Sequence, residues 1–395
     1  MRILLAADQY PEFHNGAGAA TERLAAGFAG RGHRVTVAYP SADGPGSRRC
    51  RGTVDDHRLA SVALPHGQGV RVCLPSRASR EAADLITGTG FDVVHVHSHL
   101  PVGRAVLAAA QRTGLPVVAT NHFMPENLLP HIPVPDPVRH RLAAWAWRDL
   151  ARVFGRADLV TTPTVRAAEL LADRTGLRAI PVSNGVDLSA YAPHTDTDPD
   201  GSPIVLFVGR LEDEKRVQDL LRAFAAVPLP NPARLVYVGT GSRLPMLRQL
   251  ADTLGVADRV EFWGNVSTER LRRAYTACAV FCAPGIAELQ SLVTLEAIAS
   301  GAPVIAADAV ALPHLVHHGR NGYTYPPDQP RQLTSHLTNL LTSPAVRHRM
   351  SLESRRIARI HDIETTLDAY LCCYQELCRD TRRGDLVASD RVTAA

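Results

Sequence analysis

The chain has 395 residues, of which 45% are hydrophobic and 21% are charged, and its formal net charge is +4. This length and hydrophobic content are sufficient for two domains, each with its own core. The positive charge is modest, with no basic tract and no pattern of stacking aromatic residues, so we exclude a nucleic-acid-binding protein. The seven cysteines follow no metal-ligand spacing, which predicts reduced thiols in a cytosolic protein and no metal site.

Apolar runs of strand length alternate with helical segments along the chain, which predicts parallel β-sheets. In the amino half, strands are predicted at Met1–Ala7 and Pro116–Thr120. In the carboxyl half, strands are predicted at Ile204–Val208 and Ala279–Ala283. Residues 191–203 are polar and rich in Pro and Gly, so we expect a linker there between a domain at 1–190 and a domain at 204–362.

Two cations follow the first strand of the second domain. The apolar run Ile204–Val208 breaks at Gly209 and is followed by Arg210 and Lys215 in the next loop. Arg offers a planar fork of donors and Lys offers a point charge, which together suit a diphosphate. The alternative interpretation is a solvated surface pair of cations.

Two carboxylates, Glu288 and Glu296, flank the start of a short helix that ends before Gly301. The preceding strand places this segment at the carboxyl end of a buried sheet, where open α/β sheets bind their ligands. Near Ser291, the unpaired N–H groups of the first helical turn suit a diphosphate, and the carboxylates suit sugar or ribose hydroxyls. The same segment would also form an ordinary amphipathic helix without a ligand.

The ordered series of these motifs resembles the retaining family-4 glycosyltransferases of the GT-B fold, also called glycosyltransferase group 1. The motifs that carry the resemblance are Val208-Gly-Arg-Leu211, Glu214-Lys215, Glu288, Glu296-Ala297 and Ser300-Gly301. It implies an α/β protein with two Rossmann-like, doubly wound domains that face each other across a cleft. It also implies a carboxyl-terminal helix at 363–384 that packs back on the amino-terminal domain, followed by a polar tail at 385–395 that we expect to be loose.

The resemblance implies transfer of a hexosyl group from a nucleoside-diphosphate sugar, with UDP as the expected carrier, to an acceptor hydroxyl with retention of configuration. Arg210, Lys215 and the helix start would stabilise the departing diphosphate, so we expect neither a metal nor another cofactor. Glu288 would hold sugar hydroxyls, and Glu296 would bind the ribose. His122 matches the active-site histidine of the family, although a lone histidine is also typical of an ordinary loop.

Two departures from the family pattern affect the donor site. Gln290-Ser291 stands where the family usually has Phe-Gly, and Gly16-Ala17-Gly18 replaces the usual paired glycines of the first loop. Gly16 would let the backbone approach the diphosphate, or it would simply form a tight turn. The predicted catalytic residues are His122, Arg210, Lys215 and Glu288. The predicted donor-binding residues are Gly16, Gly209, Asn265, Val266, Gln290, Ser291, Leu292, Val293 and Glu296. The predicted acceptor-side residues are His97, Asn121 and Glu126.

The acceptor is less constrained than the donor. The helix predicted over 138–154 mixes arginines with Trp145 and Trp147, which suits an anionic bilayer surface, although a core-facing helix with a solvated arginine side explains it equally well. Likeness to bacterial diacylglycerol glucosyltransferases favours a membrane lipid, and a small polyol or natural product is the alternative acceptor. A nucleotide-sugar hydrolase, an epimerase and a non-catalytic nucleotide-sugar binder remain further alternatives. Without signal-peptide features or a membrane-spanning run, we expect a cytoplasmic protein in peripheral contact with the inner face of the plasma membrane.

Overall fold

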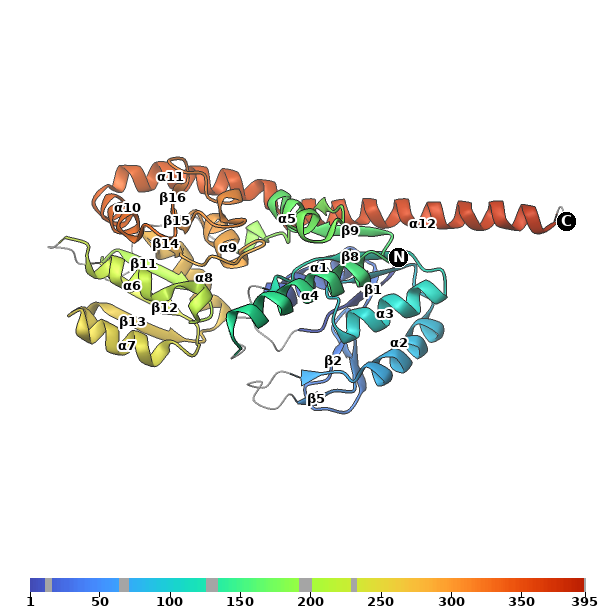
Figure 1. Ribbon diagram of the computed structural model, residues 1–395. Helices are drawn as coiled ribbons and strands as arrows, with labels where there is room; N and C mark the ends of the chain where they lie inside the picture. Colours follow the sequence, from blue (N-terminus) through green and yellow to red (C-terminus); the bar gives the residue numbers. More distant parts are fainter. Residues whose placement is uncertain (11–15, 64–70, 126–133, 192–200, 229–232, 394–395) are drawn as a thin grey trace. The chain divides into compact units, whose positions relative to one another are not determined.

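The computed structural model describes residues 1–10, 16–63, 71–125, 134–191, 201–228 and 233–393, with side chains up to residue 380. The chain forms two compact units, each built on its own sheet (Figure 1). The first unit comprises the chain up to Pro125, Val134–Gly185 and the segment from Ile363 onward, and the second unit contains Val186–Asp362. The structure therefore divides the chain at 185/186, whereas the sequence suggested 190, and most of the expected linker lies outside the described residues.

The first unit contains an eight-stranded sheet of order β10-β9-β8-β7-β1-β2-β4-β3, parallel except for the pairing of β3 with β4. The strands are β1 (Arg2–Ala6), β2 (Arg34–Pro40), β3 (Ser47–Arg51), β4 (Val54–Leu59), β7 (Val93–Val96), β8 (Val117–Thr120), β9 (Leu159–Thr162) and β10 (Ile180–Pro181). A separate antiparallel pair joins β5 (Val62–Ala63) to β6 (Arg71–Val72). The central strands are nearly continuous apolar runs because helices cover both faces of the sheet.

Among the described residues of this unit, six α-helices pack around the sheet. They are α1 (Gly16–Gly30), α2 (Pro75–Thr89), α3 (Pro101–Arg112), α4 (Asp136–Phe154), α5 (Val165–Thr175) and α12 (Ile363–Thr393). Phe28 of α1 and Tyr370 and Tyr374 of α12 belong to one apolar cluster with the strands of this sheet, so α12 packs on the first unit. The helix runs to Thr393, which differs from the loose tail expected over 385–395.

The second unit contains a six-stranded parallel sheet of order β13-β12-β11-β14-β15-β16. Its strands are β11 (Ile204–Val208), β12 (Arg234–Val238), β13 (Val260–Gly264), β14 (Val280–Ala283), β15 (Val304–Ala307) and β16 (Gly322–Tyr325). In chain order this is the 3-2-1-4-5-6 arrangement of a Rossmann fold. The strand order reverses between β11 and β14, and ligands bind beyond the carboxyl ends of the strands at such a switch point.

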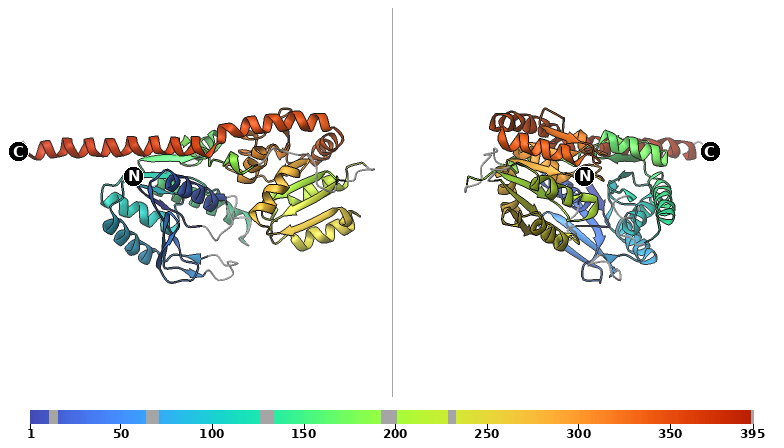
Figure 2. Two further views of the ribbon diagram at one scale, coloured as in Figure 1. Left: turned by 180° about the vertical axis from the view of Figure 1, so that it is seen from behind. Right: turned by 60° about the vertical axis from the view of Figure 1, so that its left-hand side comes forward.

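The helices of the second unit lie against both faces of its sheet (Figure 2). They are α6 (Val217–Ala225), α7 (Leu244–Thr253), α8 (Thr268–Ala277), α9 (Leu292–Ser300), α10 (Pro330–Thr342) and α11 (Pro344–Ala358). Short 3-10 turns also lie in this unit, among them η4 (Asp213–Lys215) and η6 (Leu312–His314). Helices lie on both faces because the chain moves outward from β11 in one direction and from β14 in the other, and crossovers of one hand then fall on opposite faces. Within the described residues, no helix combines the length and apolarity needed to cross a bilayer.

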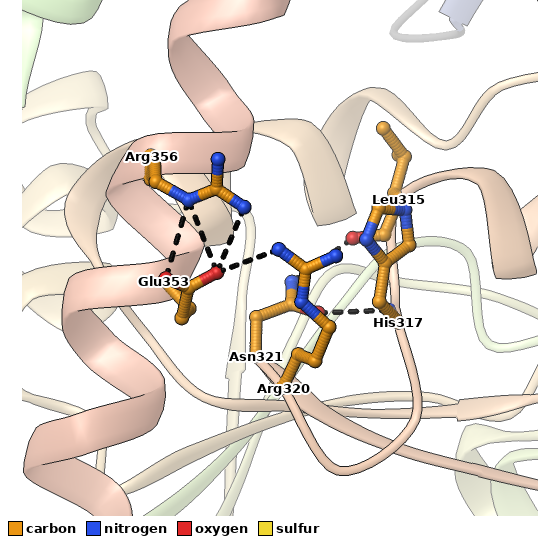
Figure 3. Close-up of polar contacts among 6 residues, drawn as sticks. All are labelled: Leu315, His317, Arg320, Asn321, Glu353 and Arg356. Carbon is orange, nitrogen blue, oxygen red and sulfur yellow. Dashed lines mark hydrogen bonds and ion pairs between the residues drawn. The ribbon is translucent and has the colours of Figure 1, made fainter.

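A buried asparagine fixes the segment between η6 and β16 (Figure 3). The Asn321 side chain is fully buried; it accepts a hydrogen bond from His317 N at 2.8 Å and donates one to Leu315 O at 3.0 Å. Beside it, Arg320 donates to Glu353 of α11 at 3.0 Å, and Glu353 also accepts from Arg356. Because a buried amide with both ends satisfied holds its backbone partners in place, this network anchors the segment that follows η6.

Candidate active site

The switch point of the second unit brings two predicted residues into direct contact. Lys215 ends η4 in the loop after β11, and Glu288 lies in the loop after β14. The Lys215 ammonium donates to the Glu288 carboxylate, and the two side chains are only 20% and 18% exposed. The sequence predicted both residues at this edge; the structure adds that they form a largely covered ion pair.

Arg210 lies at the same edge and is more accessible. Its side chain is 51% exposed, and its guanidinium donates to Glu214 Oε1 at 2.7 Å. Glu214 is buried, and sequence reasoning quoted it only as part of a motif. The spacing of four residues between Arg210 and Glu214 could have predicted this contact, because a carboxylate at that distance can form an ion pair with a guanidinium. The buried carboxylate holds the guanidinium in place while leaving much of it accessible to a ligand.

Glycines allow the loops after β11 and β12 to approach each other closely. Gly209 has a φ of 147° and donates its N–H to Val238 O at 2.9 Å. At Gly239, whose φ is 124°, an added Cβ would overlap the Gly209 carbonyl. A side chain at Gly239 would separate the loops, and the positive φ at both positions favours glycine. Sequence reasoning selected Gly209 and missed Gly239.

The amino end of α9 is built as predicted. Ser291 is the N-cap residue, and its hydroxyl accepts from Thr294 N at 3.4 Å and from Thr294 Oγ1 at 2.9 Å. Gly301, in a left-handed conformation, ends the helix. The N–H groups of Leu292 and Val293 have no acceptor within the helix, which makes this end suitable for an anion. Gln290, just before the cap, is buried.

The remaining predicted donor residues lie at two further places in this unit. Glu296, in the second turn of α9, is partly buried and accepts from the Tyr275 hydroxyl at 3.0 Å. Asn265 is exposed and Val266 is partly buried, and both follow β13. From β13 to β14 there are three strand spacings, or about 14 Å. An extended nucleoside diphosphate could lie along this edge, with its base near β13 and its phosphates near β11 and β14.

A strained residue supports the loop that carries Glu288. Val310 has a φ of 47°, which is unfavourable for a β-branched side chain. The next residue, Ala311, donates its N–H to the carbonyl of Glu288 at 3.2 Å. This segment leads into η6 and then into the segment that Asn321 anchors. The sequence contains no signal for this strain, because it arises from contacts between loops.

In the first unit, two predicted histidines lie together beyond adjacent strands. His97 follows β7, and Asn121 and His122 follow β8. His97 Nδ1 and His122 Nε2 are 3.1 Å apart, and the two rings stack with centroids 5.3 Å apart. Glu126 lies outside the described residues. The structure thus brings His97, Asn121 and His122 to one edge of the sheet.

Burial keeps these imidazoles neutral. It lowers the pKa of His122 to about 4 and the pKa of His97 well below its usual value. Burial, followed by the nearby His122, lowers the pKa of His95 to about 3. At neutral pH each ring therefore carries a single N–H, and the group can hydrogen-bond without adding positive charge.

A buried carboxylate that sequence reasoning missed supports the same edge. Asp8 follows β1 and accepts from the N–H groups of Val102 at 2.9 Å and Gly103 at 3.2 Å, at the start of α3. Burial raises its pKa, while these two bonds act in the opposite direction. Gly16, the predicted diphosphate glycine, is the first residue of α1 and is exposed. The residues that precede Gly16 in its loop, 11–15, lie outside the described part of the chain.

Comparison with known proteins identifies the family. Residues 14–190 match the model of Glycosyltransferase Family 4, and residues 195–357 match that of Glycosyl transferases group 1. The D-inositol 3-phosphate glycosyltransferase of Thermobifida fusca is 30% identical over 356 residues, covering 84% of this chain and 78% of the relative. The chain belongs to the group 1 glycosyltransferases. The GDP-mannose-dependent alpha-mannosyltransferase of Mycobacterium tuberculosis is 31% identical to this glycosyltransferase, covering 82% of this chain and 84% of the relative.

The solved structures agree on the GT-B fold of this group 1 glycosyltransferase. Anabaena HepE in complex with UDP-glucose matches it with a TM-score of 0.73 and 19% identity, covering 95% of this chain and 100% of HepE. At this identity the likeness shows the fold alone. The predictions of family, fold class and transferase activity are confirmed.

Proposed function

We propose that this glycosyltransferase moves a hexosyl group from a UDP-sugar to an acceptor hydroxyl with retention of anomeric configuration. The observation that carries the proposal is the Lys215–Glu288 pair at the switch point of the second unit. Uracil is the base that the sequence resemblance implies, and HepE, which shares the fold, was solved with UDP-glucose. The M. tuberculosis relative is named for GDP-mannose, so GDP-sugars must be tested as donors beside UDP-sugars.

The cations and the helix end act on the leaving group. A lysine ammonium has three donors, so Lys215 can contact phosphate oxygens while it still bonds to Glu288. Arg210 and the N–H groups at the start of α9 add further donors for the diphosphate. Fixed donors aimed at developing negative charge supply the electrostatic stabilisation that a metal ion provides in other enzymes. We therefore propose metal-independent transfer.

The carboxylates position the donor. One oxygen of Glu288 bonds to Lys215, which suits a residue that holds sugar hydroxyls better than a nucleophile. Glu296, which accepts a hydrogen bond from Tyr275, would bind the ribose. In the proposed reaction the bond from C1 of the sugar to the phosphate oxygen breaks, and a bond from C1 to the acceptor oxygen forms on the same face. The proton of the acceptor hydroxyl passes to the departing phosphate.

The exposed side of α4 supports a lipid acceptor. Trp145 is 58% exposed, and the exposed Arg141, Arg148 and Arg152 lie four, three and seven residues from it, on the same face. Trp147 is buried and packs inward. An exposed Trp among arginines suits the surface of an anionic bilayer, so we propose peripheral membrane contact through this face.

This contact can be tested by cosedimentation with vesicles of phosphatidylglycerol and phosphatidylcholine. We expect Trp145→Ala to reduce binding to the anionic vesicles. The control Leu352→Ala removes a side chain that is 60% exposed on α11 and should bind like wild type. Equal binding by Trp145→Ala and wild type would contradict the membrane contact.

A water-soluble acceptor is the second candidate, because the T. fusca relative is named for D-inositol 3-phosphate. The deciding experiment incubates the purified chain with UDP- and GDP-sugars and with either diacylglycerol in anionic vesicles or an inositol phosphate. Mass spectrometry then detects the glycoside, and NMR gives the anomeric configuration of its product. We expect an α-linked product from an α-linked UDP-sugar in the vesicle sample.

Matched ion-pair variants locate the reaction. Lys215→Ala and Glu288→Ala should abolish most transfer, whereas Arg273→Ala, which breaks an exposed pair with Glu269 on α8, should not. Inversion of configuration would contradict the proposed mechanism. Release of free sugar independent of acceptor would instead support a hydrolase, and donor binding without turnover would support a non-catalytic binder.

A further inference from the structure

Three imidazoles lie in a row at the carboxyl edge of the first sheet, with the rings of His95 and His97 tilted by 34° and those of His97 and His122 stacked. We call this row the histidine stack. The ring centroids of His95 and His97 are 4.1 Å apart, and those of His97 and His122 are 5.3 Å apart. Within the described part of the chain, a single hydrogen bond joins two of these rings, between His97 Nδ1 and His122 Nε2 at 3.1 Å. His122 is the outer member of the stack, since it is only partly buried while the other two are buried.

The inner histidine is held on both sides. His95 Nδ1 lies 2.6 Å from the Tyr374 hydroxyl of α12, and its Nε2 lies 2.6 Å from Thr120 Oγ1. Both partners are hydroxyls, which can donate or accept, so the His95 ring is fixed in either tautomer. Since His97 stacks on a fixed ring, its own orientation is restricted as well.

The bond between His97 and His122 contains one hydrogen, because both rings are neutral. In one arrangement His97 donates from Nδ1, and His122 then carries its own hydrogen on Nδ1. In the other arrangement His122 donates from Nε2, and His97 then carries its hydrogen on Nε2. The tautomers of the two residues are therefore coupled, and one choice determines the other.

The buried side of His97 decides between these arrangements. His97 is 3% exposed, and its Nε2 is buried with no hydrogen-bond partner among the described residues. A buried N–H without an acceptor is rarer in proteins than a buried acceptor without a donor. The arrangement in which His97 Nε2 is unprotonated is therefore favoured, and it places the ring N–H of His97 on Nδ1.

We propose that His97 is a positioning residue that donates from Nδ1 to His122 Nε2 and thereby fixes His122 as its Nδ1–H tautomer. In this state the single N–H of the His122 ring is on Nδ1, the nitrogen that is not hydrogen-bonded to His97. His122 then acts toward a substrate oxygen as a hydrogen-bond donor and not as a general base. This role deepens the proposed function and rests on it, but the tautomer itself does not depend on any substrate.

The tautomer can be measured directly in the full-length chain. The protein is labelled with ¹⁵N-histidine, and long-range ¹H–¹⁵N spectra at pH 7 without substrate distinguish protonated from bare ring nitrogens. His122→Gln identifies the His122 signals by their loss. We expect a protonated Nδ1 and a bare Nε2 in His122, and a protonated Nε2 would overturn the proposal.

Two substitutions of His97 separate positioning from packing. Asn places its side-chain N–H₂ near the position of the imidazole Nδ1, so His97→Asn should keep the His122 tautomer, whereas His97→Ala should give a mixture. An unchanged His122 spectrum in His97→Ala would also overturn the proposal. The matched control is His99→Ala, which removes another buried imidazole from the same loop.

Transfer kinetics add a second readout. In His97→Ala we expect kcat to fall about 10- to 100-fold with KM within about threefold, because a misoriented group mainly affects the transition state. His97→Asn should recover most of kcat, and His99→Ala should keep it even if its melting temperature falls. Equal kcat losses in all three variants would overturn the positioning role. Absence of transfer together with the expected tautomer would refute the proposed function and leave the tautomer assignment supported.

Discussion

Removing Lys215 and Glu288 singly and together tests whether their ion pair is functional or only structural. Two unit charges at 4 Å attract by about 4 kcal/mol at an effective dielectric constant of about 20. Exposed pairs retain at most about 1 kcal/mol of this after desolvation and side-chain ordering, whereas breaking a buried pair costs about 3–5 kcal/mol. The side chains here are 20% and 18% exposed. We therefore expect each single alanine variant to lose about 2–3 kcal/mol of unfolding free energy.

The double variant should be less destabilised than the sum of the two single variants. Each single substitution leaves one largely covered charge without its partner, and the second substitution removes that charge. We expect a coupling free energy of about 2 kcal/mol. For a domain of about 150–250 residues, each single alanine substitution should lower the melting temperature by about 5–10 °C. The exposed pair Arg273–Glu269 provides a control cycle, with an expected coupling below about 0.5 kcal/mol.

Stability and transfer should separate in the double variant. If Lys215 contacts the diphosphate and Glu288 contacts the sugar, removing both cannot restore transfer, even though it relieves the uncompensated charge. Calorimetry and initial transfer rates on all four proteins measure the two effects together. Transfer near the wild-type rate in the double variant would refute the donor-site assignment. Zero coupling in stability would refute the ion pair itself.

Three further predictions concern the fold, pH and metal ions. Gly322→Ala should have a much lower melting temperature than wild type, because the new Cβ would overlap the carbonyl of Val304. The control Gly88→Ala adds a Cβ into open space on a helix and should be neutral or slightly stabilising. Equal melting temperatures of the two variants would contradict this reasoning. The folded pKa values of His95 (about 3) and His122 (about 4) lie below the unfolded value near 6.5, so the unfolded chain binds more protons between about pH 6.5 and 4. Unfolding free energy, measured in urea, should therefore fall with decreasing pH across this window by up to about 1.4 kcal/mol per pH unit for each histidine, and a flat profile would refute their burial as neutral rings. Chelator should leave transfer unchanged; loss of activity that magnesium restores would contradict metal independence.

The sequence was sufficient for the elements and the family because both depend on local patterns. The apolar runs that predicted strands at 204–208 and 279–283 correspond to β11 and to β14, which begins at Val280. The cap residues Ser291 and Gly301 bound α9 as the pattern indicated. Such features need only neighbouring residues, so one sequence can reveal them.

The sequence was not sufficient for contacts that the strand order creates. Lys215 and Glu288 are 73 residues apart, and they meet only because β11 and β14 are neighbours in the sheet. The Asp8 carboxylate reaches the start of α3 for a similar reason, across β1 and β7. The backbone of the polar segment after residue 384 is helical as far as Thr393, because a polar composition indicates few core contacts but does not prevent a helix from continuing.

The loops at the carboxyl ends of the strands differ in charge between the two sheets. In the second unit, the loops at the switch point carry Lys215, Arg210 and the positive end of α9, which suits a diphosphate. In the first unit, the strand order reverses between β1 and β7, and the residues that follow these strands are a buried carboxylate and a neutral histidine stack. Because burial keeps the histidine rings uncharged at neutral pH, they can orient hydroxyl oxygens without attracting a diphosphate themselves. The absence of positive charge on these rings is therefore as much a part of the proposed specificity as the cations of the second unit.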